Sequence, residues 1–67
     1  MKGTIARLVR DRGFGFIRME DGREIFFHAT GVKGATFEDL SEGQSVEFEM
    51  ETDPRTGKER ATNVAPA

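Results

Sequence analysis

The stretch Arg12-Gly13-Phe14-Gly15-Phe16-Ile17 alternates large and small side chains in the pattern of a β-strand. Side chains of a strand point alternately to its two faces, so Phe14 and Phe16 share one face and Ile17 lies on the other. Arg18 extends the aromatic face, and a charged residue is rarely buried without a partner. We therefore expect the two rings to lie on the surface of the protein and Ile17 to lie in its core.

The dipeptide Asp21-Gly22 is a strong hairpin signal, because both central residues of a type I′ turn need a positive φ. It joins an expected strand over residues 14–20 to another over residues 23–29. In the second strand Ile25 and Phe27 face one way and the residues between and after them face the other. Cross-strand pairing then brings four side chains to one surface, namely Phe14, Phe16, Phe26 and His28.

The remaining strands follow from the same alternation, which is clearest where Val46, Phe48 and Met50 are separated by glutamates. No segment has the period of a helix, and turn residues recur at short spacing. The longest connection, residues 30–43, carries Phe37 and has a length at which loops are often functional. The sequence therefore predicts an all-β fold, a five-stranded antiparallel Greek-key barrel of the OB-fold type, with strands near residues 3–9, 14–20, 23–29, 44–52 and 58–65.

The length of 67 residues predicts a single domain over residues 1–67, with a small core and marginal stability. The chain has no cysteine, and His28 is its only histidine, which leaves no pair for a metal site or for a nucleophile with its base. We expect no metal, no cofactor and no enzymatic activity; a general-base role for His28 is the alternative. No signal peptide or membrane span is recognisable, so we expect a cytoplasmic protein without a membrane partner or a small-molecule substrate.

Charge is distributed unevenly along the chain, although its formal net charge is only −2 at pH 7. Residues 1–19 have a net charge of +4, whereas residues 38–53 contain no lysine or arginine and have a net charge of −7. If the fold places these segments on different faces, one face attracts phosphate and the other keeps the protein soluble. A mixed, solvated surface is the plainer interpretation.

Exposed phenylalanines beside glycines point to single-stranded nucleic acid as the ligand. A flat base reaches a ring that small neighbours leave uncrowded, and stacking is worth about 1–3 kcal/mol per base whatever the base. Arg12, at the entry to the strand, offers charge to the phosphates. The alternative is a tight strand that packs its rings inward, which is disfavoured because Ile17 and Phe27 already take the inner positions.

The chain resembles the bacterial cold shock proteins from about Lys2 to Ala65. Arg12 to Ile17 is similar to the first ribonucleoprotein motif of that family, and Ile25 to His28 is similar to the second. Further similarities lie at Gly3-Thr4-Ile5, at Leu40 with Glu42-Gly43-Gln44, and at Asn63-Val64. The resemblance implies a closed barrel that binds single-stranded DNA and RNA, commonly thymine- or uracil-rich, and acts as an RNA chaperone or a regulator of transcription or translation.

The binding residues of that family correspond here to Phe14, Phe16, Phe26, His28 and Phe37, and we expect Arg7, Arg12 and Arg18 to meet phosphates. Two positions depart from the family pattern, since Arg7 stands where a tryptophan is usual and Ala29 where a phenylalanine is usual. On the two sides of Arg7, the family has a lysine and a phenylalanine where this chain has Ala6 and Leu8. Losing two stacking surfaces costs up to several kcal/mol by the magnitudes above, about 1–3 kcal/mol each, and Arg7 recovers part of this through a phosphate or by lying on a base.

We therefore expect a monomer that binds single-stranded RNA and DNA without chemistry. The rival from another class is a protein-interaction domain that kept the barrel and lost useful nucleic-acid affinity. Arg7, Ala29 and the acidic balance favour that rival. Saturable binding of a short oligothymidine at moderate salt discriminates between the two.

Overall fold

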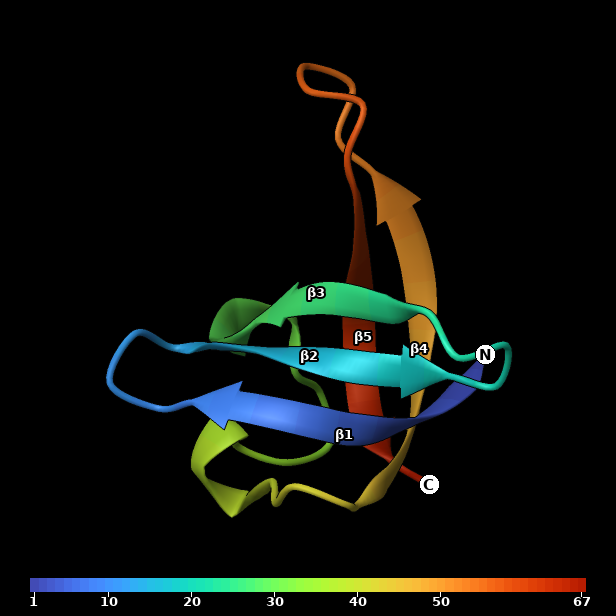
Figure 1. The fold of residues 1–67 in the computed structure, drawn as a ribbon. Coiled ribbons are helices and arrows are strands. Elements are labelled where there is room, and N and C mark those ends of the chain that lie inside the picture. Colours follow the sequence, from blue (N-terminus) through green and yellow to red (C-terminus); the bar gives the residue numbers. More distant parts are fainter.

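The computed structural model describes all residues, 1–67, as five strands and two short 3-10 turns (Figure 1). Each strand begins and ends within one residue of the limits expected from the sequence. No helix in the structure is both long enough and apolar enough to cross a membrane. The strands are β1 (Lys2–Val9), β2 (Phe14–Met19), β3 (Glu24–His28), β4 (Ser45–Thr52) and β5 (Glu59–Pro66), and the turns are η1 (Ala29–Gly31) and η2 (Phe37–Asp39).

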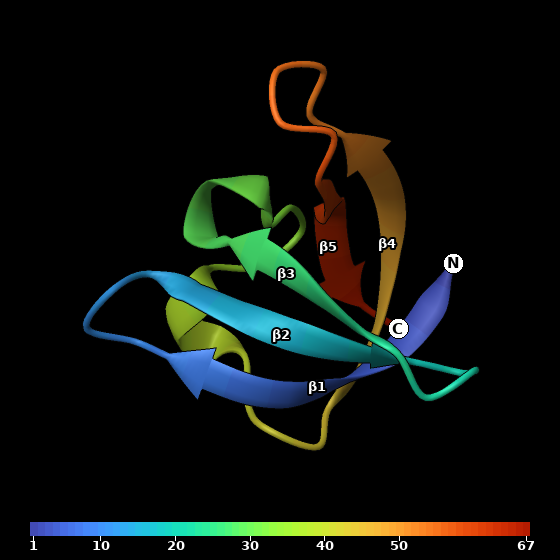
Figure 2. The same ribbon diagram turned by 45° about the horizontal axis from the view of Figure 1, so that its top comes forward.

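The strands close into a barrel in the order β1-β2-β3-β5-β4, which confirms the expected fold class. β1, β2 and β3 form a meander, and β4 and β5 cross behind it as a hairpin whose tip projects beyond the barrel (Figure 1). One pairing departs from the antiparallel pattern, because β3 and β5 run parallel where Phe26 meets Arg60. The reason is topological, since neighbours around a closed ring of five strands cannot all alternate in direction. In Figure 2, β5 lies between β3 and β4, as it does in this strand order.

The β2–β3 hairpin has the expected register, with Phe16 opposite Phe26, but its turn differs from the expected type I′. The Met19 N–H donates to the Arg23 carbonyl at 2.7 Å, so the pairing continues to these residues and the loop between them is 20–22. Among these three residues only Gly22 has a positive φ, of 92°. The Gly22 N–H donates to the Met19 carbonyl at 2.9 Å, which makes a tight turn followed by one left-handed residue. The Arg23 backbone N–H and the Arg23 guanidinium both donate to the Asp21 carboxylate. These hydrogen bonds, the backbone one foremost, hold the pKa of Asp21 below its ordinary value.

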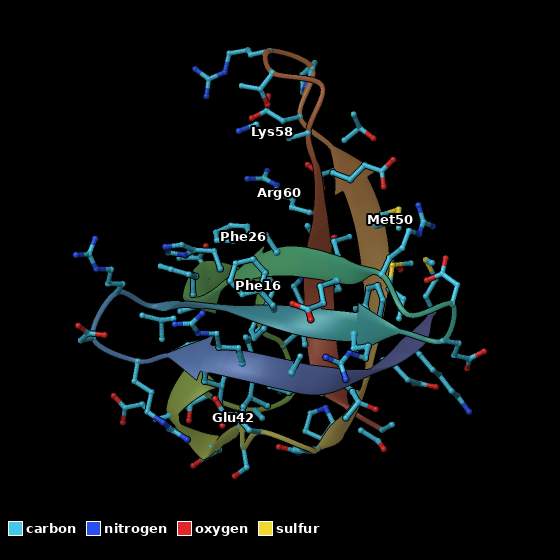
Figure 3. All side chains as sticks on the ribbon, viewed as in Figure 1. Phe16, Phe26, Glu42, Met50, Lys58 and Arg60 are labelled. Atoms are coloured by element: carbon cyan, nitrogen blue, oxygen red, sulfur yellow. The ribbon has the colours of Figure 1, made fainter.

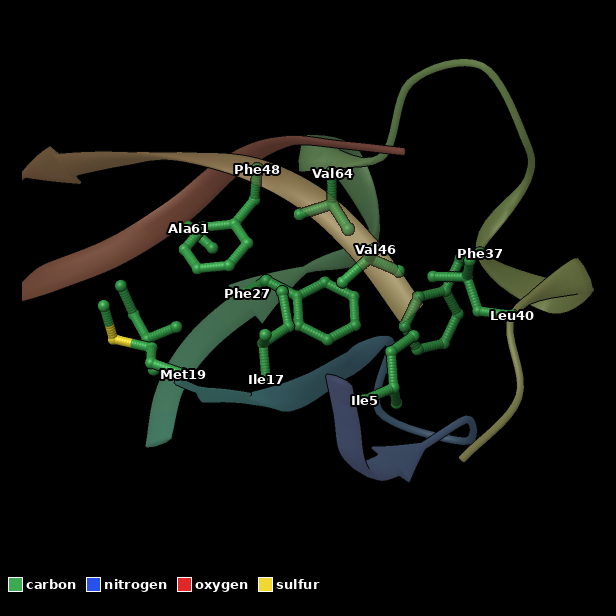
Figure 4. Close-up of a cluster of buried hydrophobic side chains, with 11 residues drawn as sticks. Ile5, Ile17, Met19, Phe27, Phe37, Leu40, Val46, Phe48, Ala61 and Val64 are labelled. Atoms are coloured by element: carbon green, nitrogen blue, oxygen red, sulfur yellow. The ribbon is translucent and has the colours of Figure 1, made fainter. Parts of the chain in front are cut away.

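The core lies between the meander and the β4–β5 hairpin and consists of inward side chains from all five strands and from the connection between β3 and β4 (Figure 4). Phe27 is fully buried at its centre, and no polar side chain is buried. The expected alternation is confirmed on β2, β3 and β4. Gly15 is also buried, and its surroundings leave no room for a side chain. A Cβ at this position would lie 2.6 Å from the Arg7 carbonyl oxygen and 2.8 Å from the Phe27 ring. The buried hydrophobic residues are Ile5, Ile17, Met19, Ile25, Phe27, Phe37, Leu40, Val46, Phe48, Ala61 and Val64.

The long connection between β3 and β4 closes one end of the barrel. Its turn η2 directs Phe37 inward, so that the ring is only 9% exposed and lies 5.9 Å from the ring of Phe27, centroid to centroid. Arg10 holds this turn from outside by donating to the Glu38 carbonyl at 2.9 Å and to the Leu40 carbonyl at 2.8 Å. Phe37 therefore packs on Phe27 with only its rim exposed, and its expected contact with nucleic acid stays a prediction.

Candidate nucleic-acid interface

Three phenylalanine rings gather on the outer surface of β2 and β3. The centroids of Phe14 and Phe26 lie 5.5 Å apart, those of Phe14 and Phe16 5.9 Å, and those of Phe16 and Phe26 6.1 Å. Phe26 is 36% exposed, and the other two rings are half-buried against it. We call these three residues the aromatic platform. Their separations are those of favourable aromatic pairs, so the rings stabilise one another while their outer faces stay accessible.

His28 extends the platform at one edge, because it is the cross-strand partner of Phe14 and its side chain is exposed. The Thr30 backbone N–H donates to Nδ1 of His28 at 3.2 Å, and the Thr30 hydroxyl lies 3.0 Å from the same atom. An accepting Nδ1 leaves the proton of the neutral ring on Nε2. The imidazole is thus held in place by the first turn after β3.

Two of the three platform rings, Phe16 and Phe26, lie within a row of cross-strand partners that runs over four strands. Arg7 of β1 is paired with Phe16, Phe16 with Phe26, and Phe26 with Arg60 of β5. Partners in register place their side chains on the same face of a sheet, so the two arginines flank the two rings. Figure 3 shows Phe16, Phe26 and Arg60 following one another from β2 toward the β4–β5 hairpin. We refer to Arg7, Phe16, Phe26 and Arg60 as the flanked row.

Arg7 reaches the row through an irregularity in β1, where the pairing register with β2 shifts between Ile5 and Arg7. The carboxylate of Glu42 accepts from the Leu8 N–H at 3.1 Å, which satisfies a donor on the side of β1 away from β2. A shift of this kind re-aims the following side chain. It turns Arg7 outward beside Phe16, at the position where the family resemblance places an aromatic residue.

The three arginines expected to meet phosphates differ in their surroundings. Arg7 and Arg12 are exposed and form no ion pair, so their guanidinium groups are free. Arg18 lies 3.2 Å from the Glu24 carboxylate, its cross-strand partner, with both side chains exposed. An exposed pair of this kind is worth at most about 1 kcal/mol, so Arg18 is weakly held but partly neutralised.

Phe37 does not join the platform, and neither does Ala29. The rim of Phe37 lines a shallow hollow with Arg10, Gly13, Ala29 and Thr36, beside the platform rather than on it. Ala29 is half-buried against the core and offers no ring surface there. Sequence reasoning missed Arg60, for which the only local signal was its outward alternation with the buried Ala61.

The acidic residues of β4 point outward, with strand β5 between them and the platform. Glu47, Glu49 and Glu51 are all exposed, and Glu49 accepts from the Asn63 side-chain amide at 3.0 Å. No group of three or more histidine, cysteine, aspartate or glutamate side chains is arranged to hold a metal ion. The two charged segments are therefore only partly separated, because Glu42 lines a hollow with Arg7 and Arg10 and Glu47 is the cross-strand partner of Lys2. A closed five-stranded barrel with exposed rings on β2 and β3 is a barrel of the oligonucleotide-binding type.

Comparison with known proteins assigns this barrel to one family. The model of the 'Cold-shock' DNA-binding domain matches residues 1–67. Cold shock-like protein CspLB of Listeria monocytogenes is 46% identical over 48 residues, which are 72% of this chain and 73% of that protein. Cold shock protein 1 of Lactiplantibacillus plantarum is 39% identical over 64 residues, or 96% and 94% of the two chains. Cold shock protein CspC of Bacillus subtilis is 36% identical over 66 residues, or 98% and 97%.

The chain therefore belongs to the cold-shock domain family and is a nucleic-acid-binding protein of the cold-shock type. Residues 1–67 are matched as a whole, so both aromatic segments and the β4–β5 hairpin fall within the family domain.

Proposed function

We propose that this protein binds single-stranded RNA and DNA by stacking bases on the aromatic platform, and that it acts by binding alone, without catalysing a reaction. The observation that carries the proposal is the cluster of three surface rings, each within 6.1 Å of the other two. Burying hydrophobic rings in the core is the usual outcome for phenylalanine. Three rings kept together on the surface instead support a ligand with flat apolar faces.

Single strands are favoured over duplexes for a physical reason. The faces of bases in a duplex are already stacked on their neighbours, whereas an unpaired base gains about 1–3 kcal/mol by stacking on an aromatic ring. Phe14, Phe16 and Phe26 provide such rings, and His28 adds a fourth flat surface with one hydrogen-bond donor. The rim of Phe37 is left to contact a base only at the hollow beside the platform.

Positive charge near the platform supports contact with the phosphates. Arg7 and Arg12 have free guanidinium groups, and Arg18 is held only by an exposed pair with Glu24. Such contacts fix the position of a strand without reading its sequence. We infer an RNA chaperone or a regulator of transcription or translation, because sequence-tolerant stacking suits a protein that holds strands open. We further propose that the protein is cytoplasmic and monomeric.

A protein-interaction domain without useful nucleic-acid affinity is the second candidate. Arg7 and Ala29 favour it, since each replaces a ring at a position where the resemblance expects one. A partner protein would contact the same platform through apolar side chains. The two candidates therefore differ in the ligand they predict, and not in the surface they use.

The deciding experiment is a titration of fluorescently labelled heptathymidine followed by anisotropy at moderate salt. The label is needed because the chain has no tryptophan or tyrosine. We expect saturable one-site binding that unlabelled single strands displace and a long, G·C-rich duplex without single-stranded ends does not. Equal competition by the duplex, or no binding at all, contradicts the proposal. Lys2→Gln, at the far end of β1, serves as the control for loss of one surface charge.

A further inference from the structure

The flanked row ends at Arg60, which lies beside Phe26 on β5 but does not belong to the aromatic platform. Resting on the proposed function, we propose that Arg60 binds a backbone phosphate of the single strand beyond Phe26, and that Glu51 competes with this phosphate for the guanidinium. The interface then extends from β1 across four strands to the β4–β5 hairpin.

The position of Arg60 follows from the parallel seam of the barrel. β5 places Arg60 in register with Phe26 and the buried Ala61 in register with Phe27, so Arg60 has the same outward orientation as the platform ring. A shallow hollow continues from Phe26 onto the hairpin and is lined by Phe26, Asp53, Thr56, Lys58, Glu59 and Arg60. A strand whose base stacks on Phe26 thus passes its backbone toward this hollow.

Lys58 adds a second positive charge at the same place. It lines this hollow and also the neighbouring one that Phe16 and Phe26 share, and it forms no ion pair. Figure 3 shows Lys58 above Arg60, on the hairpin that rises from the platform. The hairpin therefore offers one free and one paired cation beyond the last exposed ring, in a hollow that the carboxylates of Asp53 and Glu59 also line.

Arg60 can exchange its ion pair with Glu51 for a contact with a phosphate. One guanidinium nitrogen lies 3.3 Å from a Glu51 carboxylate oxygen, and the two side chains are 50% and 55% exposed. An ion pair this open contributes little to stability, so the guanidinium leaves it at little cost. Guanidinium and phosphate form charge-assisted, often bidentate hydrogen bonds. Glu51 thus lowers affinity in two ways, by holding Arg60 and by repelling the phosphate that replaces it.

The test compares four variants with wild type by titration of labelled heptathymidine at two salt concentrations. Arg60→Gln should weaken binding by about three- to tenfold and make the salt slope shallower by about 0.7, the value for one phosphate on a single strand. Glu51→Gln should strengthen binding by about two- to fivefold, in line with the release of an exposed ion pair. Lys2→Gln and Glu47→Gln make the same charge changes away from the row and report the effect of net charge alone.

A double-mutant cycle separates competition from simple repulsion. The gain of Glu51→Gln over Glu47→Gln should largely disappear when Arg60 is already glutamine. If wild type binds heptathymidine but Arg60→Gln and Lys2→Gln weaken binding equally, this inference is overturned and the proposed function stands. Failure of wild type itself to bind overturns the proposed function. Circular dichroism confirms that each variant is folded.

Discussion

Phe26 and Phe27 are adjacent in β3, yet their side chains lie on opposite sides of the barrel wall. Phe26 is 36% exposed and packs on Phe14 and Phe16, whereas Phe27 is fully buried and packs on Phe37. The strand period of two residues produces this division. It separates the binding role of one ring from the folding role of the other within a single dipeptide.

Replacing Phe26 by alanine should weaken binding, whereas replacing Phe27 by alanine should lower stability. Phe26→Ala should weaken single-strand binding by about 1–3 kcal/mol, the value of one stacked base, and leave the fold largely intact. Phe27→Ala should lower the free energy of unfolding by about 3–5 kcal/mol, as for other core phenylalanines, and unfold much of a domain this small. Urea denaturation and heptathymidine titration measure the two effects. A Phe27→Ala variant as stable as wild type contradicts the assignment of faces.

The salt dependence of nucleic-acid affinity should change more when a free arginine is replaced than when an ion-paired arginine is replaced. The logarithm of affinity should fall with the logarithm of salt at a slope of about −1.5 to −3, because about 0.7 is expected for each of two to four phosphate contacts. Arg12→Ala should make this slope shallower by more than Arg18→Ala does, because Arg18 is already partly neutralised by Glu24 at 3.2 Å. A wild-type slope steeper than about −5 means that charge, and not stacking, dominates.

Gly15 should tolerate no side chain, because a Cβ there would meet backbone and a core ring. This atom would lie 2.6 Å from the Arg7 carbonyl oxygen and 2.8 Å from the Phe27 ring. Gly15→Ala should therefore destabilise the domain by about 1–3 kcal/mol, as overpacked cores do.

Gly31→Ala is the matched control for Gly15→Ala. Its Cβ would lie 3.5 Å from the Ala61 carbonyl oxygen, which is ordinary contact, and its φ is not positive. This variant should be neutral, or more stable by up to about 1 kcal/mol through the restricted unfolded chain. Equal melting temperatures of the two variants contradict the close approach at Gly15.

Much of this surface could be predicted from the sequence, because alternation within a strand is a local property. Phe14, Phe16, Phe26 and the inward Ile17 and Phe27 follow from the period of two residues alone. Asp21-Gly22 marked the hairpin, but the dipeptide fits turns of two or three residues, and only the second residue takes a positive φ here.

Phe37 and Arg60 depend on contacts between distant segments and could not be placed in this way. The connection that carries Phe37 has no strand period to say which way its ring faces. Arg60 meets Phe26 only because β3 and β5 pair in parallel across the barrel seam. No local pattern fixes the register of two strands that are far apart in the sequence.

Arg7→Trp should raise the affinity for thymine-rich single strands. Arg7 is exposed and paired with Phe16, so an indole at this position would extend the row of rings by one. The expected gain is about 1–2 kcal/mol, or roughly five- to thirtyfold, after loss of the arginine charge. The salt slope should become shallower by about 0.7 if Arg7 meets one phosphate. Weaker binding by a folded Arg7→Trp means that the arginine makes a specific contact of its own.

Ala29→Phe should act in the same direction, because it restores a ring next to His28 at the other departure from the family pattern. The two gains need not add if both rings meet the same base. Heptathymidine titration of both single variants and the double variant measures this coupling.

Amide chemical-shift mapping with heptathymidine shows whether single strands bind across the outer surface of β2 and β3. We predict that the largest shifts fall on Phe14, Phe16, Phe26 and His28, with smaller ones at Arg7 and Arg60. Glu47 and Glu49 on β4 should stay unchanged, and the same map should appear with an RNA oligomer of equal length. Shifts centred on β4, or no shifts at saturating oligonucleotide, would contradict the account.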